Sequence, residues 1–517
     1  MHTATSDPKE ETEFLQRGFG IRRRPWNKLL LLIPAILGGA GAFAQYNPPA
    51  TQAPFNPIAL AEVTGTPRTA VQAGQNSYQS LSQNPYLGGI PSGKLSATPV
   101  ALSLEDAVTI GLKQNLGGAL ASDAITDARG QRWQALSELL PNVVTDTGFG
   151  LHQVNVKAAF GLTIPGQPRI IGPFGYFDSR AYLTQSIFDW SSIQRERSSQ
   201  AQVKSAEFAS KDARELIVLV IVSNYLLVNA DQSEVDSATS QRDTSKALLQ
   251  QASDQKTAGL ASAVDVLRQQ VQLQSREQKL IVAQNNLAKQ KLVLARAIGL
   301  PLAQQFETTT QVPYHELAAS GLDEAIQSAY SARPDFQSQL NRAKSAELAR
   351  KAASAERYPS IGAEADYGLS GVNPGTSHGT IDAAATLRIP IFQGGRVHGD
   401  VLRADAAVSE ERQRLENMRA SIDQEVRDAY LDLQAIAEEV SVEKSAVTLG
   451  TQNLEQSRDR FTSGVTDNVE VVQAQDALAT ANDAYIASLY SYNLAKISLA
   501  RATGVAESRY AEYLRGN

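Results

Sequence analysis

The chain of 517 residues contains no cysteine. Disulfide bonds, thiolate catalysis, cysteine metal sites and a lipid anchor on a cysteine are therefore excluded. The histidines are scattered without metal-ligand spacing, and the sequence has neither a glycine-rich phosphate loop nor a nucleophile elbow. We expect no catalytic residues and no cofactor, and the sequence argues against an enzyme.

Basic charge and aromatic residues are also scarce. The formal net charge is −6 and aromatic residues make up 6% of the chain, so no basic surface favours nucleic acid as a partner. A composition leaning toward Ala, Gln, Ser and Leu suits long helices. The apolar run at 216–228 carries Ser223 and Asn224 and is shorter than the ~20 residues of a membrane span, which favours a buried helix.

The N-terminal region has the pattern of an export signal. Four basic residues precede an apolar run at 29–43 that ends in Ala42-Phe43-Ala44: Arg22, Arg23, Arg24 and Lys28. Residues 1–44 are predicted to be a secretory signal peptide, and a membrane anchor is the alternative reading. Residues 45–100 are rich in Pro, Gln and Ser with very few charges, so this extension after the signal peptide should be extended or disordered.

After residue 100 the chain repeats itself. The segment at Ser103 corresponds to the segment at Gly321, an offset of 218 that also relates Pro141 to Pro359. The offset becomes 204 for residues such as 183, 187 and 188, and 205 from residue 225 onward. We predict a first copy at 101–300, a connector at 301–320, a second copy at 321–505 and a tail at 506–517.

Each copy predicts the same series of elements. One helix (104–140 or 322–358) stops at a proline, two strands follow, and then a long helix (191–256 or 395–461) extends for roughly 100 Å. Gly259 or Gly464 marks a turn, after which a helix returns to Gly299 or Gly504. A returning helix at 261–298 and an opening helix at 322–358 together match one long helix, so stacked end to end they could line it.

The strands are recognised by their period of two. At 361–370 and 381–391 apolar or small residues alternate with polar ones, which gives each strand one apolar and one polar face. In the first copy 176–188 keeps this alternation, and the strand after Pro141 loses it near Gln153.

The returning helix of the second copy has a regular seven-residue repeat. Large residues at 471, 478, 485, 492 and 499 alternate with small ones at 474, 481, 488, 495 and 502. In the first copy the large positions persist, but the small ones are mostly polar. A seven-residue period keeps one stripe facing a neighbouring helix. Heptads alone leave an ordinary two-helix coiled coil open, whereas narrow seams also suit helices rolled into a tube.

The strands decide between these readings. Alternating segments with one apolar face match membrane strands of about 9–11 residues. Four strands cannot close a barrel, for which ~8 is the smallest number, and open edges are not tolerated in lipid. More than one chain must therefore contribute.

Several motifs together resemble the TolC-like outer-membrane efflux family. They are "LPNV" and "YPSI" at the helix exits, "SIFDW" and "PIFQGGR" after the strands, and "FTSGVTDNVEVVQAQDALATA" with the later "LARATG". The resemblance covers 101–505 with both copies in order. It implies an α+β membrane protein: a homotrimer with a 12-stranded outer-membrane β-barrel continued by a 12-helix periplasmic α-barrel.

The resemblance also implies a function. Such a channel gives solutes a passive exit in a tripartite efflux or type I secretion system, together with a periplasmic adaptor protein and an inner-membrane transporter. The barrel would be anchored in outer-membrane lipid without an acylated cysteine. A periplasmic coiled-coil adaptor or binding protein without a pore is the alternative from another class.

The family's tunnel narrows near the helix turns, where acidic residues form a ring. By position the resemblance assigns this aperture to Glu470, Asp265 and Asp467, and the turns to Gly259, Gly464 and Phe461. A second family aspartate falls at Gln473, with Arg268 as its counterpart in the first copy, so that ring is missing or displaced. Carboxylates around a narrow mouth would attract cations. A solvated helix flank is the alternative for Glu470, and turn packing for Phe461.

Overall fold

The structure is a computed structural model that describes residues 84–515, except 93, 94, 97, 156, 157, 159, 160, 162–167, 260, 318–320, 464 and 467. All described residues belong to one unit, Pro67–Asn517. The expected signal peptide and residues 45–83 of the extension lie outside them. The described end of the extension packs on the folded body, where strand β1 (Val100–Leu102) pairs in parallel with β4 (Phe306–Thr308).

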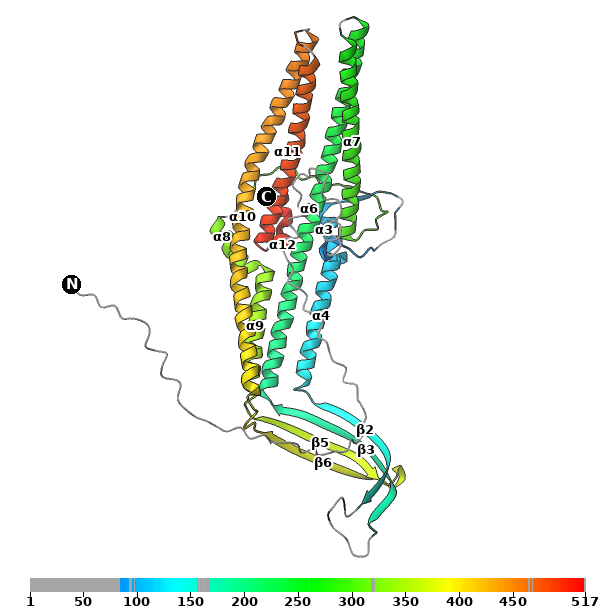
Figure 1. The fold of residues 1–517 in the computed structure, drawn as a ribbon, viewed down its shortest axis with the longest axis vertical. Coiled ribbons are helices and arrows are strands. Elements are labelled where there is room, and N and C mark those ends of the chain that lie inside the picture. Colours follow the sequence, from blue (N-terminus) through cyan, green and yellow to red (C-terminus); the bar gives the residue numbers. More distant parts are fainter. Residues whose placement is uncertain are drawn as a thin grey trace, which may run out of the picture. The chain divides into compact units, whose positions relative to one another are not determined.

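The two copies fold alike, as the repeat predicts (Figure 1). The first contains α3 (Leu104–Gln114), α4 (Leu116–Ser137), β2 (Asn142–Asn155), β3 (Ile170–Phe188), α6 (Trp190–Thr257) and α7 (Ala263–Ile298). The second contains α8 (Leu322–Ala332), α9 (Pro334–Ala355), β5 (Ser360–Gly371), β6 (His378–Arg388), α10 (Arg396–Thr462) and α11 (Asn468–Ala502). A C-terminal helix, α12 (Ala506–Arg515), follows.

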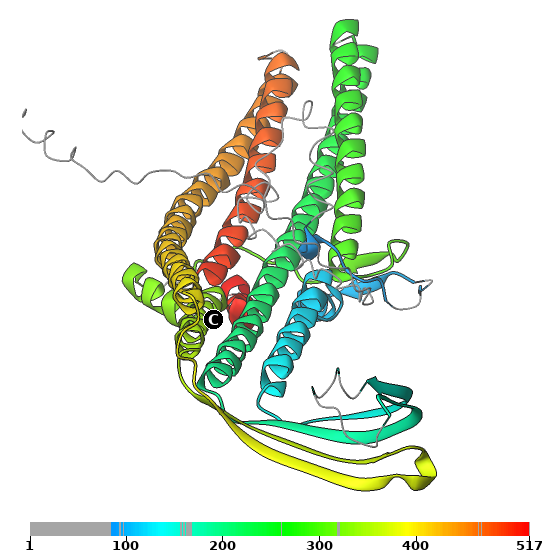
Figure 2. The same cartoon turned by 60° about the horizontal axis from the view of Figure 1, so that its bottom comes forward.

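The four long strands form one antiparallel sheet in the order β2-β3-β5-β6 at one end of the helices (Figure 2). Strand β3 pairs across the copies with β5, so the two hairpins join into one layer. The predicted strand at 381–391 ends earlier, at Arg388, where β5 also begins with Ser360. The prediction was wrong for 389–391 because no described strand pairs with them and Pro390 lacks an N–H.

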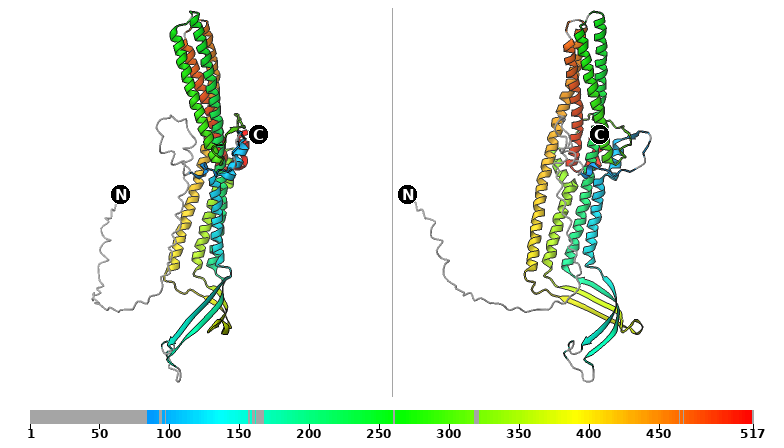
Figure 3. Two further views of the ribbon diagram at one scale, coloured as in Figure 1. Left: turned by 90° about the vertical axis from the view of Figure 1, so that its right-hand side faces the viewer. Right: turned by 45° about the vertical axis from the view of Figure 1, so that its right-hand side comes forward.

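The long helices run to the opposite end and turn back as hairpins (Figure 3). Helix α6 has 68 residues and α10 has 67, each within one residue of the predicted bounds. Their neighbours are ordered α10, α11, α6, α7 in the half that carries the turns, and α10, α9, α6, α4 in the half next to the sheet. Helix α10 is therefore lined by α11 and α9, and α6 is lined by α11 and α9 on one side and by α7 and α4 on the other, so two successive shorter helices can line a long one, as expected.

The predicted opening helices are each broken into two, so that prediction was wrong. Asn115 adopts an extended conformation between α3 and α4, and its amide oxygen caps Gly117 N–H at 2.9 Å. Arg333 is extended between α8 and α9 because Pro334 follows it, and the ring excludes the helical conformation from the preceding residue.

Each break receives the end of the returning helix from its own copy. The amide of Asn115 donates to the carbonyl of Ala297 at 3.1 Å, and the guanidinium of Arg333 donates to the carbonyl of Ala502 at 3.3 Å. The expected end-to-end partners, 261–298 with 322–358, come from different copies and are wrong. Helix α7 instead meets the α3–α4 break, and α11 meets the α8–α9 break.

The hydrophobic core lies at the middle of the long helices, in a band we call the equator. There α3 and α12 pack around α6, and α8 packs on α10 (Figure 1). Strands β1 and β4 contribute Leu102 and Phe306 to the same core. Helix α6 contains a stretch that is long and apolar enough to cross a membrane, but most of that stretch is buried inside the protein, and Ile217, Ile221 and Val222 of the run at 216–228 are fully enclosed. It is the buried helix that the sequence predicts.

Small residues let α6 and α9 approach closely next to the sheet. The hydroxyls of Ser198 and Ser345 lie 3.0 Å apart, as do those of Ser205 and Ser338, and all four side chains are buried. The serines repeat every seven residues on both antiparallel helices. A narrow seam with a seven-residue period therefore joins the two copies here, in helices for which the sequence analysis did not predict one.

Tyr225 provides a test of the equatorial core. Its hydroxyl donates to Leu102 O and accepts from Thr310 N–H, each at 3.0 Å, inside the buried cluster. Tyr225→Phe leaves the partly buried Thr310 N–H without its partner, while Leu102 O keeps its hydrogen bond from Thr309 N–H at 3.1 Å, so we expect the free energy of unfolding to fall by about 1–2 kcal/mol. Thermal and denaturant unfolding measure this loss. Tyr358→Phe, at an exposed tyrosine, is the control, and an equal loss there would contradict the assignment.

Candidate functional site

The sheet has one apolar and one polar face, as the alternation predicts. The register places like residues opposite each other, for example Phe149 with Phe177 and Tyr367 with Ile381. The apolar face consists of Val143, Phe149, Leu151, Phe177, Ala181, Leu183, Ala365, Tyr367, Leu369, Ile381, Ala383, Ala385 and Leu387. Most of its large side chains are exposed, for example Leu151 to 74% and Ile381 to 72%, and Phe177 is half-buried. Such a surface is suited to lipid.

The polar face is organised by Arg180 on the central strand β3. Its guanidinium forms ion pairs with Asp366 on β5 and with Asp178 at 3.5 Å, and it donates to the hydroxyl of Thr380 on β6 at 2.8 Å. Asp382 lies 3.9 Å away. The network links three strands on the polar face of the sheet, and sequence alternation alone did not single it out.

The first hairpin turns at Gly259, whose φ of +76° lies in the left-handed region that favours glycine. Asp265 lies in the first turn of α7, in a capping box with Ser262, and forms an ion pair with Arg268 at 3.2 Å. The hydrogen bond from the Ser262 hydroxyl, with the nearby charge of Arg268, lowers the pKa of Asp265. The carboxylate is therefore charged and partly compensated.

The second hairpin turns between Thr462 and Asn468. Gly464 and Asp467 lie outside the described residues. Phe461 is half-buried in the last turn of α10, and Gln473 is exposed. Glu470, in the first turn of α11, accepts a hydrogen bond from the Thr466 hydroxyl and lies 3.5 Å from the guanidinium of Arg460. Both described acidic residues of the assigned aperture thus begin a returning helix and face an arginine.

Polar side chains connect the two hairpins near these turns. Gln269 on α7 donates to the amide oxygen of Asn468 on α11 at 2.6 Å. Arg276 is only 3% exposed, yet its guanidinium forms an ion pair with Asp476 on α11 and donates to Gln241 on α6 at 3.1 Å.

These contacts explain the polar heptad of the first copy. Gln269, Arg276 and Gln290 occupy positions where the second copy has small residues, and Gln290 donates to Asn224 on α6 at 2.9 Å. The sequence signal for these contacts was a polar residue at a heptad position that faces a neighbouring helix. The partner residues could not be predicted from it, because they come from other helices.

The contact region between the two helical hairpins, α6–α7 and α10–α11, is lined largely by polar side chains. A cavity of about 340 Å³ lies between α6, α7, α10 and α11, and hydroxyl and amide side chains form much of its wall. Nearer the equator, burial together with the charge of Glu234 raises the pKa of Asp231 to about 6. Burial and the charge of Asp231 raise the pKa of Tyr490 on α11 to about 12. Asp231 therefore titrates near neutral pH.

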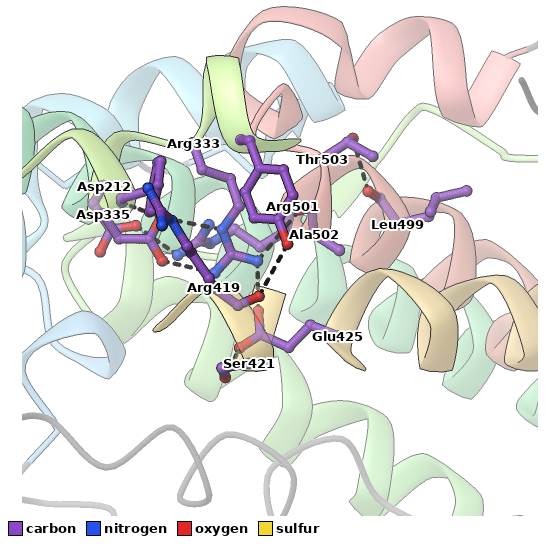
Figure 4. Close-up of polar contacts among 12 residues, drawn as sticks. Asp212, Arg333, Asp335, Arg419, Ser421, Glu425, Leu499, Arg501, Ala502 and Thr503 are labelled. Atoms are coloured by element: carbon purple, nitrogen blue, oxygen red, sulfur yellow. Dashed lines mark hydrogen bonds and ion pairs between the residues drawn. The ribbon is translucent and has the colours of Figure 1, made fainter. Parts of the chain in front are cut away.

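A buried ionic cluster surrounds the α8–α9 break (Figure 4). Arg333 contacts Asp335 at 2.6 Å and Glu425 at 2.5 Å, while Arg501 contacts Asp212 on α6 at 2.5 Å. Burial by itself would raise the pKa of Asp335, but the hydrogen bonds and charge of Arg333 lower it. The cluster ties α6, α9, α10 and α11 together where the returning helix ends.

Comparison with known proteins gives consistent results. The model of a family described as outer membrane efflux protein matches residues 121–300 and 325–505. The outer membrane protein TolC of Escherichia coli K12 is 24% identical over 348 residues, covering 62% of this chain and 68% of that protein.

Solved structures share the fold. The CmeC outer membrane channel of Campylobacter jejuni has a TM-score of 0.70 at 17% identity, with 82% of this chain and 92% of that chain covered. The outer membrane protein VceC of Vibrio cholerae has a TM-score of 0.67 at 19% identity, with 78% and 96% covered.

The raised pKa of Asp231 predicts a pH-dependent stability. An aspartate in the unfolded chain has a pKa of ~3.9, whereas Asp231 in the folded protein has a pKa of about 6. The folded protein therefore holds this proton more tightly than the unfolded chain. The stability that results is fully present below pH ~3.9 and is lost as the pH rises through about 6. Asp231→Asn should therefore raise the free energy of unfolding at pH 7 by about 1–2 kcal/mol, after discounting for solvent screening, and should have little effect near pH ~4.

Denaturant unfolding of both proteins across pH 4–8 measures this difference. Asp236→Asn, at an exposed position on the same helix, is the matched control and should leave the pH profile unchanged. A stability gain for Asp231→Asn that is the same at every pH would contradict the assignment.

Proposed function

Because the chain belongs to the outer membrane efflux protein family, we propose that it is the exit duct of a tripartite efflux or type I secretion system. It is an outer-membrane channel protein with a periplasmic helical tunnel, and not an enzyme. In the proposed system solutes cross the duct passively, an inner-membrane transporter supplies the energy, and a periplasmic adaptor protein connects the two.

The observation that carries this proposal is an apolar sheet with two open edges. Strands β2 and β6 are the outer members of the sheet, and no described strand pairs with their outer edges. Unpaired backbone groups are too costly in lipid, and four strands are too few to close a barrel. Three chains would supply twelve strands, pair every edge and enclose the polar face around water.

The helices support the same assembly. Their layer also has two free flanks, α10 on one side and α7 with α4 on the other. Both flanks carry exposed aliphatic residues, including Val264, Leu267 and Val271 on α7 and Leu431, Val442 and Leu449 on α10. In a homotrimer these flanks would meet, and the helices would form a 12-helix tunnel continuous with the barrel.

A pore-free periplasmic adaptor is the rival function. It would share the heptads and the hairpins, but it would have no use for a sheet whose apolar face is exposed in water. The exposure of Phe149, Leu151, Tyr367 and Ile381 therefore favours the membrane channel.

We assign the tunnel mouth to the hairpin turns, with Asp265 and Glu470 as its described acidic groups, and with Asp467. Both described carboxylates face arginines, Arg268 at 3.2 Å and Arg460 at 3.5 Å. The mouth would therefore carry a more balanced charge than a ring of bare carboxylates. Its cation preference should be modest and should depend on these ion pairs.

Purification in detergent and reconstitution in planar bilayers test the proposed duct. We expect the mass of three chains, β-structure that is modified by heat, and discrete single-channel conductance. A protein that is monomeric and soluble without detergent would contradict the proposal, and so would a trimer that forms no pore.

Glu470→Ala tests the assigned mouth. Removal of the carboxylate leaves Arg460 uncompensated, so the preference for cations over anions should decrease. Reversal potentials in a salt gradient measure the change. Glu439→Ala, at an exposed position of α10 far from the turn, removes the same charge and should leave the reversal potential unaltered. An unchanged reversal potential for Glu470→Ala would exclude it from the mouth.

A further inference from the structure

The strand β6 stops short of its counterpart in the first copy. Strand β3 continues to Phe188, and Phe188 corresponds to Phe392 at the offset of 204. Strand β6 ends at Arg388. The two residues beyond it that correspond to Ile187 and Phe188 are almost fully exposed, Ile391 to 95% and Phe392 to 88%.

The difference has a physical cause in the sheet. The last residues of β3 have a partner strand, because Gln185 lies opposite Ala363 and Phe188 lies opposite Ile361 on β5. The residues after Arg388 have no such partner among the described strands. The end of β3 and the segment after β6 are equivalent in the two copies, yet they differ in structure. The end of β3 pairs with β5, whereas the segment after β6 lies at an open edge of the sheet.

The repeat conserves strand register. Equivalent residues of the first strands, β2 and β5, are 218 positions apart in the sequence, and those of the second strands, β3 and β6, are 204 positions apart. Applied to the pair Val143 and Leu183 in the first hairpin, these offsets give Ile361 and Leu387, which is a pair of the second hairpin. They likewise convert Phe149 opposite Phe177 into Tyr367 opposite Ile381.

The same offsets can be applied to the pairing between copies. Leu183 opposite Ala365 and Gln185 opposite Ala363 are pairs of β3 with β5. Adding 204 to the residue numbers of the β3 members, Leu183 and Gln185, gives Leu387 and Ile389. Subtracting 218 from the residue numbers of the β5 members, Ala365 and Ala363, gives Thr147 and Thr145 on β2, the strand at the other open edge of the sheet.

We propose that residues 389–392 become a strand on assembly, extending β6 along β2 of a second copy of this chain. Leu387 then lies opposite Thr147 of the partner subunit, and Ile389 lies opposite Thr145 of the partner subunit. This inference rests on the proposed trimer, and it specifies the register in which the barrel closes.

The local chemistry agrees with an added strand. Ile389 continues the apolar alternation of Ile381, Ala383, Ala385 and Leu387. Pro390 corresponds to Ser186, the residue directly before the register shift between Ser186 and Phe188, and bulges are among the few positions where a strand tolerates proline. Pairing also satisfies backbone groups that would otherwise be open in lipid.

Disulfide cross-linking can test the register directly, because the natural chain has no cysteine. Opposed residues of antiparallel strands have Cα atoms ~4.5–5.5 Å apart, within the range of a disulfide. The double variants Leu387→Cys with Thr147→Cys, and Ile389→Cys with Thr145→Cys, should form bonds between chains under mild oxidation. Leu387→Cys with Leu151→Cys, displaced by four residues along the strand, is the matched control.

The full-length variants are purified in detergent, their mass is measured, and oxidised samples are separated without reductant. We expect cross-linked chains from the first two variants and uncross-linked chains from the control. The pair Ala383→Cys with Leu151→Cys repeats the test at the other end of the same ladder, so a single poorly folding variant does not decide the outcome.

The other outcomes separate this inference from the proposed function. A trimer that cross-links only through the control pair would overturn the register and leave the channel intact. A trimer that cross-links at Leu387 but not at Ile389 would overturn the strand extension. A trimer without any of these cross-links would overturn the pairing of β6 with β2, and a monomer would overturn the proposed function as well.

Discussion

The structure depends on one constraint: a sheet with an apolar face cannot keep open edges in a membrane. The chain supplies four strands, and their outer members β2 and β6 have no described partner on one side. In the assembly that we propose, further copies of the chain would supply the missing hydrogen-bond partners. The long helices are attached directly to these strands, α6 after β3 and α10 close behind β6, so any arrangement that closes the sheet also arranges the helices around the same axis.

The equator solves a second problem, which is how shorter helices line a long one. Each copy interrupts its opening helix and receives the end of its returning helix there. The first copy uses the neutral amide of Asn115, and the second uses Arg333, held by Asp335 and Glu425. The same geometry is thus built with two chemistries. Only the second adds charged groups, whose ion pairs connect the α8–α9 break to α10 and connect α11 to α6.

Several features were predictable because they depend on local periodicity. Alternation located the strands and their apolar face, and the absence of interior proline located α6 and α10 to within one residue. The break at Arg333 could have been read from Pro334, which lies inside the predicted helix. The break at Asn115 has no proline and depends on contacts with Tyr86 and Ala297, which are far away in sequence. The early end of β6 likewise depends on the lack of a neighbouring strand.

The sequence by itself therefore determined the duplication, the types and lengths of the main elements, and the face that each strand presents, because these follow from repeats and from the periods of helix and strand. The tertiary structure decided which polar residues meet. Arg276 with Asp476, Gln269 with Asn468 and Arg180 with Asp366 come from different helices or strands. No periodicity records such partners, because their distances are set by how whole elements pack.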